Sequence, residues 1–192
     1  MTRHLRPTII LVASLLSLAA ASPTAQSAAD NGDGITVRQD KGIFTVTATF
    51  EVPQSAGLAI AVLTDYDRIA HFMPDVSKSV VIERDAARTV VEQEAVAKLM
   101  MFSKRVHLVL DVQHEGSVIR FRDRCGQSFK RYEGSWRLTP SGTRTAITYE
   151  LTAEPSFDVP GFILGRVLKR DAKRMIEGLR QEMARRARSS AS

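Results

Sequence analysis

The sequence predicts an α+β fold in which a curved antiparallel β-sheet of about seven strands wraps around one long C-terminal α-helix. Short runs of alternating apolar and polar residues recur through the middle of the chain, as in antiparallel strands with one buried face. Two short helical patterns interrupt these runs early, between Ser55 and Pro74. The segment from Val159 onward is one long amphipathic helix, and no other element is long enough to cover the apolar face of the sheet.

The N-terminal residues have the plan of a secretory signal peptide. Two arginines precede an apolar run, Thr8–Ala21, and small residues continue to Ala29. The run is about fourteen residues long, shorter than the roughly 18 that indicate a membrane span, so an uncleaved anchor is the less favoured alternative. We expect a signal peptide over residues 1–29, cleaved after Ala21 or Ala29, and a periplasmic or secreted bacterial protein.

The rest of the chain predicts one domain without a disulfide. Residues 30–188 are long enough to bury a sizeable core, and residues 189–192 are expected to form a disordered tail. Cys125 is the only cysteine, so no intrachain disulfide can form. Its small side chain suits an apolar filling role; an intermolecular bond or a free thiol are the alternatives.

Positive charge is concentrated in the C-terminal helix. The chain has 27 basic and 21 acidic residues, whereas Val159–Ser192 alone has nine basic and three acidic residues. The remainder of the domain is slightly acidic, which argues against a nucleic-acid-binding surface, and no nucleic-acid partner is expected. The basic side chains either form a solvated face or make transient contact with an anionic membrane, where each contributes about 1 kcal/mol.

Alternation and proline define the first elements. Ile43–Val52 has one apolar and one Thr-rich face, and it follows a possible short strand at Ile35–Arg38. Pro53 ends the longer strand. Ser55 can then cap a helix that continues through Leu63.

The next segment, Val62–Val81, is dense in apolar and turn residues. Thr64 or Asp65 can cap a second short helix, which ends near Phe72 because residues before Pro74 avoid helical geometry. Strand alternation resumes directly after this proline. We expect the segment to form one wall and the mouth of an internal apolar pocket.

Six further strands follow as an antiparallel meander joined by short turns. Their predicted ranges are Val76–Glu83, Thr89–Met101, Lys104–Gln113, Val118–Arg124, Phe129–Leu138 and Arg144–Ala153. Alternation turns Leu108, Trp136 and Tyr149 towards the covered face of the sheet. Val118–Arg124 is ambiguous, because three arginines share one face, and one of them could contact a ligand instead of solvent.

The C-terminal helix has a single apolar stripe. Its apolar residues repeat at intervals of three and four, which places them on one side of the helix at about 100° per residue. They are Leu164, Leu168, Ala172, Met175, Leu179 and Met183. We expect this stripe to lie on the sheet.

No residue pattern predicts a catalytic or metal centre. The histidines of the domain are His71, His107 and His114, and none belongs to a zinc-binding spacing. No serine lies in a nucleophile elbow, and Cys125 has no histidine near it in the sequence. We expect no catalytic residue, no metal and no cofactor, and we consider an enzyme the less favoured possibility.

Two stretches carry a resemblance to a known family. They are Ala61–Ile69 (AVLTDYDRI) with the following Phe72-Met73-Pro74, and Pro160–Leu168 (PGFILGRVL). With the order of elements, they resemble the START-like or SRPBCC superfamily, and more narrowly its polyketide cyclase/dehydrase and coenzyme Q-binding group. The resemblance implies a helix-grip fold over the whole domain. It does not specify the ligand, because the superfamily includes lipid and sterol carriers, quinone-binding proteins, aromatase/cyclases and hormone receptors.

The candidate pocket residues are apolar or aromatic, although each alone is better explained as plain core. They are Phe72, Met73, Leu99, Met101, Phe102, Leu108, Trp136, Tyr149, Phe157, Phe162, Leu164 and Leu168. Possible polar contacts are His71, Arg120 and Arg122.

These observations predict non-catalytic binding or transport of a small apolar ligand, namely a lipid, quinone or polycyclic compound, in a cavity between sheet and helix. The alternative is a cyclase/dehydratase-type enzyme acting on a polyketide-like or aromatic substrate. It would need ionisable groups that face the cavity. An interaction module with a filled core is the third hypothesis.

Overall fold

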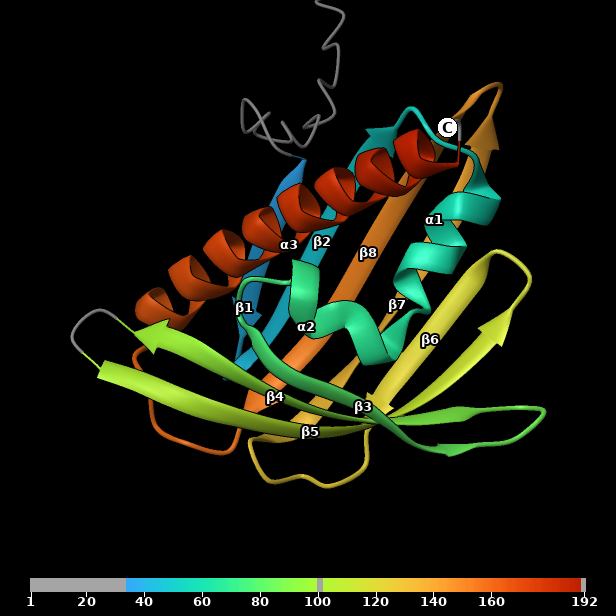
Figure 1. Ribbon diagram of the computed structural model, residues 1–192. Helices are drawn as coiled ribbons and strands as arrows, with labels where there is room; N and C mark the ends of the chain where they lie inside the picture. The colour runs from blue at the N-terminus through green and yellow to red at the C-terminus, as the bar shows by residue number, and fades with distance from the viewer. Residues whose placement is uncertain (1–33, 100–101, 191–192) are drawn as a thin grey trace, which may run out of the picture.

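The structure, a computed structural model, describes residues 34–99 and 102–190, with Leu99 and Phe102 described by their backbone alone (Figure 1). The expected signal peptide lies outside this part of the chain, and so do Met101 and the last two residues of the expected tail. No helix within the described ranges combines the length and the apolar character needed to span a membrane.

One antiparallel sheet of eight strands forms the body of the molecule, in the order β1-β2-β8-β7-β6-β5-β4-β3. The strands are β1 Ile35–Asp40, β2 Ile43–Val52, β3 Val76–Arg84, β4 Thr89–Leu99, β5 Phe102–Glu115, β6 Val118–Asp123, β7 Phe129–Ser141 and β8 Arg144–Pro155. The predicted α+β class is confirmed. The additional strand relative to the expected seven is β1, which pairs with β2 from Ile35↔Ala48 to Asp40↔Ile43.

The concave face of the sheet carries the core, as alternation predicts. Every second residue of β2 is buried there: Phe44, Val46, Ala48, Phe50 and Val52. β5 contributes a matching series, Val106, Leu108, Leu110 and Val112. On the opposite, convex face β2 exposes Thr45, Thr49 and Glu51.

Two short helical segments follow β2. The first, α1, spans Ala56–Leu63, and the Ser55 hydroxyl accepts a hydrogen bond from the Leu58 amide nitrogen at 3.3 Å, so the predicted cap is confirmed. The second is a 3₁₀ turn, Tyr66–Arg68, that continues directly into α2, Ile69–Phe72.

Neither Thr64 nor Asp65 caps the second segment as expected, and the Thr64 hydroxyl instead donates a hydrogen bond to the carbonyl oxygen of Ile60 at 2.8 Å. Asp65 makes no side-chain cap. Asp67 instead accepts a hydrogen bond from the Val81 amide nitrogen at 2.8 Å, which ties the 3₁₀ turn to β3. The helix stops before Pro74, as expected, since Met73 already has extended backbone angles.

The last element, α3, spans Gly161–Ser189 and runs diagonally over the concave side of the sheet (Figure 1). Its buried residues include Ala172, Leu179 and Met183, so the predicted apolar stripe lies on the sheet. The helix continues through Ser189 and is followed by the C-cap Ser190, which are the first two residues of the expected tail.

Gly178 allows α3 to pack tightly against α2. A Cβ atom at this position would lie 2.5 Å from the carbonyl oxygen of Phe72. No larger residue fits without moving one of the two backbones, so this glycine sets the distance between the helices.

Candidate ligand cavity

A cavity of about 270 Å³ lies between the concave face of the sheet and α3, and it is partly open to solvent. The volume is close to the lower end of the roughly 300–1,000 Å³ range of ligand pockets. Its wall is mostly apolar and comes from β2, β4 to β8, α3 and the segment between Leu63 and Val76. The helix supplies Leu164, Val167, Leu168, Ala172 and Met175 to this wall.

Six aromatic rings form a connected wall along β6, β7, β8 and the segment that follows β8. They are Phe121, Phe129, Tyr132, Trp136, Tyr149 and Phe157. The shortest centroid distances are 4.4 Å for Trp136 and Tyr149, which are cross-strand partners, and 4.9 Å for Phe129 and Tyr132. Rings at these distances attract one another and offer extended faces to a planar ligand.

Gly134 leaves the space for one of these rings. It is the cross-strand partner of Phe121. A Cβ atom at Gly134 would lie 2.6 Å from Cζ of Phe121 and 2.1 Å from the carbonyl oxygen of Glu150. Because the glycine has no side chain, the Phe121 ring reaches across β7 to within 6.0 Å of the Tyr132 ring and 6.3 Å of the Tyr149 ring.

Two phenol groups give this wall hydrogen-bonding capacity. Burial raises the pKa of Tyr132 to about 12, although a hydrogen bond with Tyr149 opposes the shift. Burial also raises the pKa of Tyr149 well above 10. Both hydroxyls therefore stay neutral at physiological pH. Because Tyr149 donates its proton to Tyr132, the Tyr132 hydroxyl is the one left to donate a hydrogen bond to a carbonyl or hydroxyl of a ligand.

Two carboxylates lie on the cavity wall where α3 passes the loop before β3. Asp75 forms an ion pair with Arg174 at 2.9 Å. Asp171 accepts hydrogen bonds from Arg170, the shorter at 2.7 Å. Burial nevertheless raises the pKa of Asp171 above its usual value. Asp171 is thus the wall residue with the clearest capacity for proton exchange.

The sequence of this fold matches a family model described as "Polyketide cyclase / dehydrase and lipid transport" over residues 52–180. The chain belongs to this family. The match spans the elements that form the cavity, from the end of β2 to the middle of α3. A search of curated protein sequences found no significant match.

Solved structures of the START superfamily share the helix-grip fold. An aromatase/cyclase, Zhui from Streptomyces sp. R1128, has a TM-score of 0.66 at 18% identity, covering 77% of this chain and 98% of that one. A START superfamily protein from Mycobacterium smegmatis has a TM-score of 0.63 at 16% identity, covering 73% and 97%. A STAR-related lipid transfer protein from Xanthomonas axonopodis has a TM-score of 0.56 at 18% identity, covering 79% and 99%. At these identities the likeness establishes the fold alone.

The structure brings seven of the candidate pocket residues together on the cavity wall: Met73, Leu108, Trp136, Tyr149, Phe157, Leu164 and Leu168. Phe162 is not among them, because its side chain points outward and is 65% exposed. Phe72 is also absent from the wall; it packs partly buried against the core, with the Arg186 guanidinium 6.0 Å from its ring. Met101 and the side chains of Leu99 and Phe102 lie outside the described part of the chain.

The three possible polar contacts lie away from the cavity. His71 is exposed, with its Nδ1 3.3 Å from the carbonyl oxygen of Arg68. Arg120 pairs with Glu115 at 3.0 Å, and Arg122 pairs with Glu133 at 2.9 Å. The face of β6 that was ambiguous in the sequence is therefore resolved, with arginines outward and the neighbouring Ile119 and Phe121 inward.

Several wall residues were not anticipated. Phe121 could have been found from alternation once the arginines of β6 were placed in solvent, and Tyr132 shares a predicted face with Trp136. Alternation alone puts Phe129 on the opposite face of β7, and it reaches the wall because the strand register shifts between Phe129 and Arg131. Asp75 and Asp171 had no such signal. They meet the cavity only because α3 crosses the loop before β3, which no local pattern encodes.

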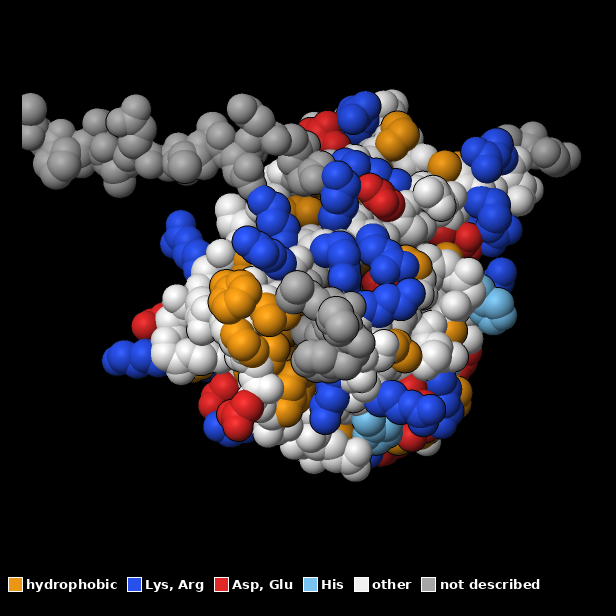
Figure 2. All heavy atoms as spheres, turned by 90° about the vertical axis from the view of Figure 1, so that its left-hand side faces the viewer, with side chains coloured by type: hydrophobic (Ala, Val, Ile, Leu, Met, Phe, Trp, Pro, Cys, Tyr) orange, Lys and Arg blue, Asp and Glu red, His pale blue; other side chains and the backbone are white. Residues whose placement is uncertain are grey.

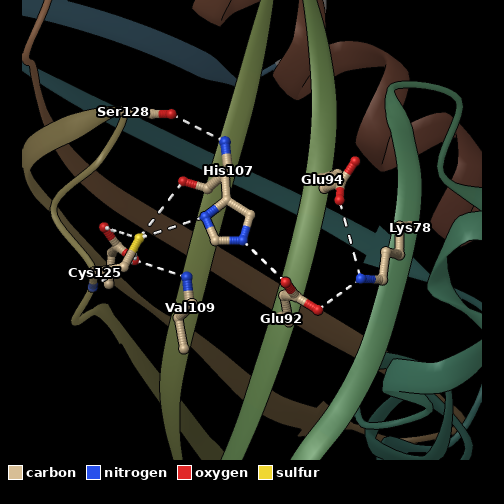
Figure 3. A network of polar contacts seen from close by, with 8 residues as sticks. Lys78, Glu92, Glu94, His107, Val109, Cys125 and Ser128 are labelled. Carbon is tan, nitrogen blue, oxygen red and sulfur yellow. Dashed lines mark hydrogen bonds and ion pairs between the residues drawn. The ribbon is translucent and has the colours of Figure 1, made fainter.

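A second cluster of ionisable residues lies on the convex face (Figure 3). His107 Nε2 lies 3.1 Å from Glu92, and its Nδ1 lies 3.8 Å from the thiol of Cys125. Glu92, His107 and Cys125 thus lie in the order of a catalytic acid, histidine and thiol. Sγ of Cys125, however, also lies 3.2 Å from the carboxylate of Asp123. Burial, with a further contribution from Asp123, raises the pKa of the thiol, so it is not an activated nucleophile.

The same cluster has evident structural contacts. Lys78 pairs with Glu92 at 2.7 Å and so links β3 to β4, while Asp123 accepts a hydrogen bond from the Val109 amide nitrogen at 2.8 Å. Within the described residues, no three His, Cys, Asp or Glu side chains are placed to hold a metal ion. We interpret the cluster as a set of cross-strand contacts.

Proposed function

We propose that this protein binds a small apolar ligand in the cavity between the sheet and α3, and that it carries the ligand without transforming it. The observation that supports this function most is the composition of the cavity wall, where aliphatic side chains of α3 and β5 face a connected series of six aromatic rings. Burial of apolar ligand surface contributes roughly 25 cal/mol per Å².

The wall also indicates the chemical class of the ligand. Neutral Tyr132 and Tyr149 suit a ligand with one carbonyl or hydroxyl group among otherwise apolar atoms. The aromatic wall favours a planar ring system such as a quinone or polycycle, while a lipid chain would use the aliphatic side formed by residues such as Leu164 and Leu168. An anionic ligand would lose its hydration and would also meet the carboxylates of Asp75 and Asp171 on the cavity wall.

Native mass spectrometry of the protein purified from its own host tests this function. We expect a non-covalently bound apolar molecule that organic extraction releases unchanged. Ala95→Phe, which adds a ring to the cavity wall, should reduce its occupancy at least about tenfold. Ala146→Phe on the opposite face of β8 is the matched control and should retain the ligand. A wild-type protein that carries no apolar molecule and acquires none from a host lipid extract would contradict the proposal.

One observation favours the enzymatic alternative, a cyclase/dehydratase. The carboxyl group of Asp171 lies on the cavity wall, and burial raises its pKa, as in carboxyl groups that exchange protons with a substrate. Incubating the protein with an aromatic polyketide-like compound and analysing the product by mass spectrometry separates the two functions. Conversion by the wild type that Asp171→Asn abolishes, with binding retained, would establish the enzyme. Recovery of the unmodified compound supports the carrier.

Export to the periplasm is also part of the proposal, because the first 29 residues have the composition of a signal peptide. Mass spectrometry of the mature N-terminus would test it. We expect a chain that begins after Ala21 or Ala29. A full-length chain recovered from the cytoplasm of its host would contradict export.

A further inference from the structure

The basic side chains of α3 fall into two groups. From Arg174 onward, several of them form ion pairs within the domain. Arg174 pairs with Asp75 at 2.9 Å, and Arg186 bonds both Asp65 at 2.6 Å and Glu182 at 2.7 Å. These pairs hold α3 to the loops beside α1 and α2.

The N-terminal end of α3 exposes a large apolar side chain beside a cation. Phe162 is 65% exposed, and the guanidinium of Arg166 lies 6.0 Å from the centre of its ring. Leu164, two positions later, is buried and lines the cavity. Two residues correspond to about 200° of helical rotation, so Phe162 points outward at the place where the helix also closes the cavity.

The facing end of the sheet is also basic. Lys104 continues the inward series of β5 that includes Val106 and Leu108, yet it is exposed, and its Nζ lies 5.1 Å from the centre of the Phe157 ring. Phe157 belongs to the cavity wall, as does Ala97, the cross-strand partner of Lys104. The cavity therefore extends to this end of β5, where the ammonium group of Lys104 takes the place of the aliphatic side chains of Val106 and Leu108. We call this end the cavity rim.

Charge at this end has one dominant sign. Residues 98–105 and 157–171 together contain six basic and two acidic residues, and one of these acids, Asp171, pairs with Arg170 at 2.7 Å. Lys104, Arg105 and Arg166 form no ion pair with any residue that the structure describes. Figure 2, which faces this side of the molecule, shows a hydrophobic patch with Lys and Arg side chains above it and acidic side chains at its lower edge.

We propose that this end of the molecule, formed by Phe157, Phe162, Lys104, Arg105 and Arg166, docks onto an anionic lipid bilayer. We call these five residues the docking face. Phe162 enters the boundary between headgroups and acyl chains, and the cations contact lipid phosphates. Docking places the cavity rim at the bilayer, which suits exchange of an apolar ligand. The sequence predicted membrane contact through the whole basic helix. The docking face limits this contact to the first turns of α3 and the N-terminal end of β5.

Vesicle co-sedimentation tests the proposal without reference to any cavity ligand. The probe is phosphatidylcholine vesicles containing about a quarter phosphatidylglycerol, compared with phosphatidylcholine alone. The full chain is used, and mass spectrometry verifies that every variant has the same N-terminus. Binding through Thr8–Ala21 would then be common to all variants and to both vesicle types.

We expect wild-type protein to bind the anionic vesicles and to release in high salt. Lys104→Gln with Arg166→Gln should weaken binding about 25-fold, because each cation near the surface contributes roughly fivefold. Phe162→Ser should weaken it by about tenfold. The matched controls are Arg120→Gln with Arg137→Gln, which remove equal charge elsewhere, and Ile82→Ser, another exposed apolar residue on β3; both should bind as the wild type.

Equal loss of binding in the charge-matched control would overturn the proposal, since only net charge would then matter. Wild-type-like binding by Phe162→Ser would also overturn it. A dimer that Phe162→Ser dissociates, with no vesicle binding, would assign this face to a second copy of the chain instead. Ligand occupancy, measured separately by native mass spectrometry, distinguishes these failures from failure of the carrier function.

Discussion

At the scale of single residues, the aromatic wall depends on an absent side chain. Phe121, Tyr132 and Tyr149 belong to three different strands, and their rings meet over the backbone of Gly134. Any Cβ atom at that position would approach the Glu150 carbonyl oxygen to 2.1 Å, which a small shift of the Phe121 ring could not relieve. The glycine thus determines both the strand packing and the shape of the cavity.

Gly134→Ala should therefore lower the free energy of unfolding by about 2–3 kcal/mol, because the new methyl group displaces both a strand backbone and a ring. Chemical denaturation monitored by Trp136 fluorescence would measure the change. Gly57→Ala is the matched control: nothing lies within 4 Å of its added Cβ. Gly57 is the second residue of α1, where alanine favours the helix more than glycine does, so that change should be neutral or stabilising. Equal stability of the two variants would refute this account of Gly134.

At the scale of elements, α3 is fixed at its C-terminal half by a buried carboxylate. Glu182 is 7% exposed and accepts hydrogen bonds from Arg185 and Arg186, each at 2.7 Å. Arg186 also reaches Asp65 and the ring of Phe72 in the second short helical segment, and it donates a hydrogen bond to the carbonyl oxygen of Ala61 in α1 at 3.4 Å. Nearer its N-terminus, where Phe162 and Arg166 belong to the docking face, α3 is held by the pair of Arg174 with Asp75 at 2.9 Å.

The hydrogen bond from Arg185, together with that from Arg186, lowers the pKa of Glu182 to about 2 from its usual 4.5. A carboxyl with a lowered folded-state pKa stabilises the fold above its unfolded pKa and loses this effect as pH falls towards the folded pKa. Glu182→Gln should therefore destabilise the protein by about 1–3 kcal/mol at neutral pH. The difference should shrink between pH 4.5 and about 2.

Thermal unfolding of wild type and Glu182→Gln across this pH range would measure the effect. The control is Glu51→Gln, which breaks the exposed pair with Arg144 at 2.9 Å and should cost less than about 1 kcal/mol. A difference between wild type and Glu182→Gln that does not change with pH would show that the carboxylate charge has no part in holding α3.

At the scale of the whole molecule, the sheet and α3 enclose a cavity instead of a fully packed core. An empty apolar cavity forfeits dispersion contacts, so a bound ligand would complete the packing of the native state. This effect links the proposed carrier function to the stability of the entire domain.

Removal of the ligand should therefore lower the melting temperature. A ligand present at 100 times its Kd contributes about 2.7 kcal/mol, which corresponds to roughly 5–10 °C for a domain of this size. Differential scanning calorimetry before and after delipidation would measure the shift, and adding back the extracted material should restore it. An unchanged melting temperature would mean that the ligand does not bind the folded cavity.

Local patterns in the sequence were sufficient for the fold. Alternation placed Leu108, Trp136 and Tyr149 on the concave face, Pro74 ended α2, and the spacing of apolar residues turned one stripe of α3 towards the sheet. These features depend on neighbouring residues alone, because side-chain direction follows directly from strand and helix periodicity.

Only the tertiary structure decided which side chains face the cavity in two segments. These are Val62–Val81, which was expected to form one wall and the mouth of the pocket, and the first turn of α3. Met73 lines the cavity while Phe72 packs outside it, and Phe162 faces solvent although Leu164 is buried. Asp171 reaches the wall from α3, where it meets the loop that contains Asp75. These outcomes depend on the curvature of the sheet and on the path of α3 across it, which arise from contacts between residues far apart in the chain.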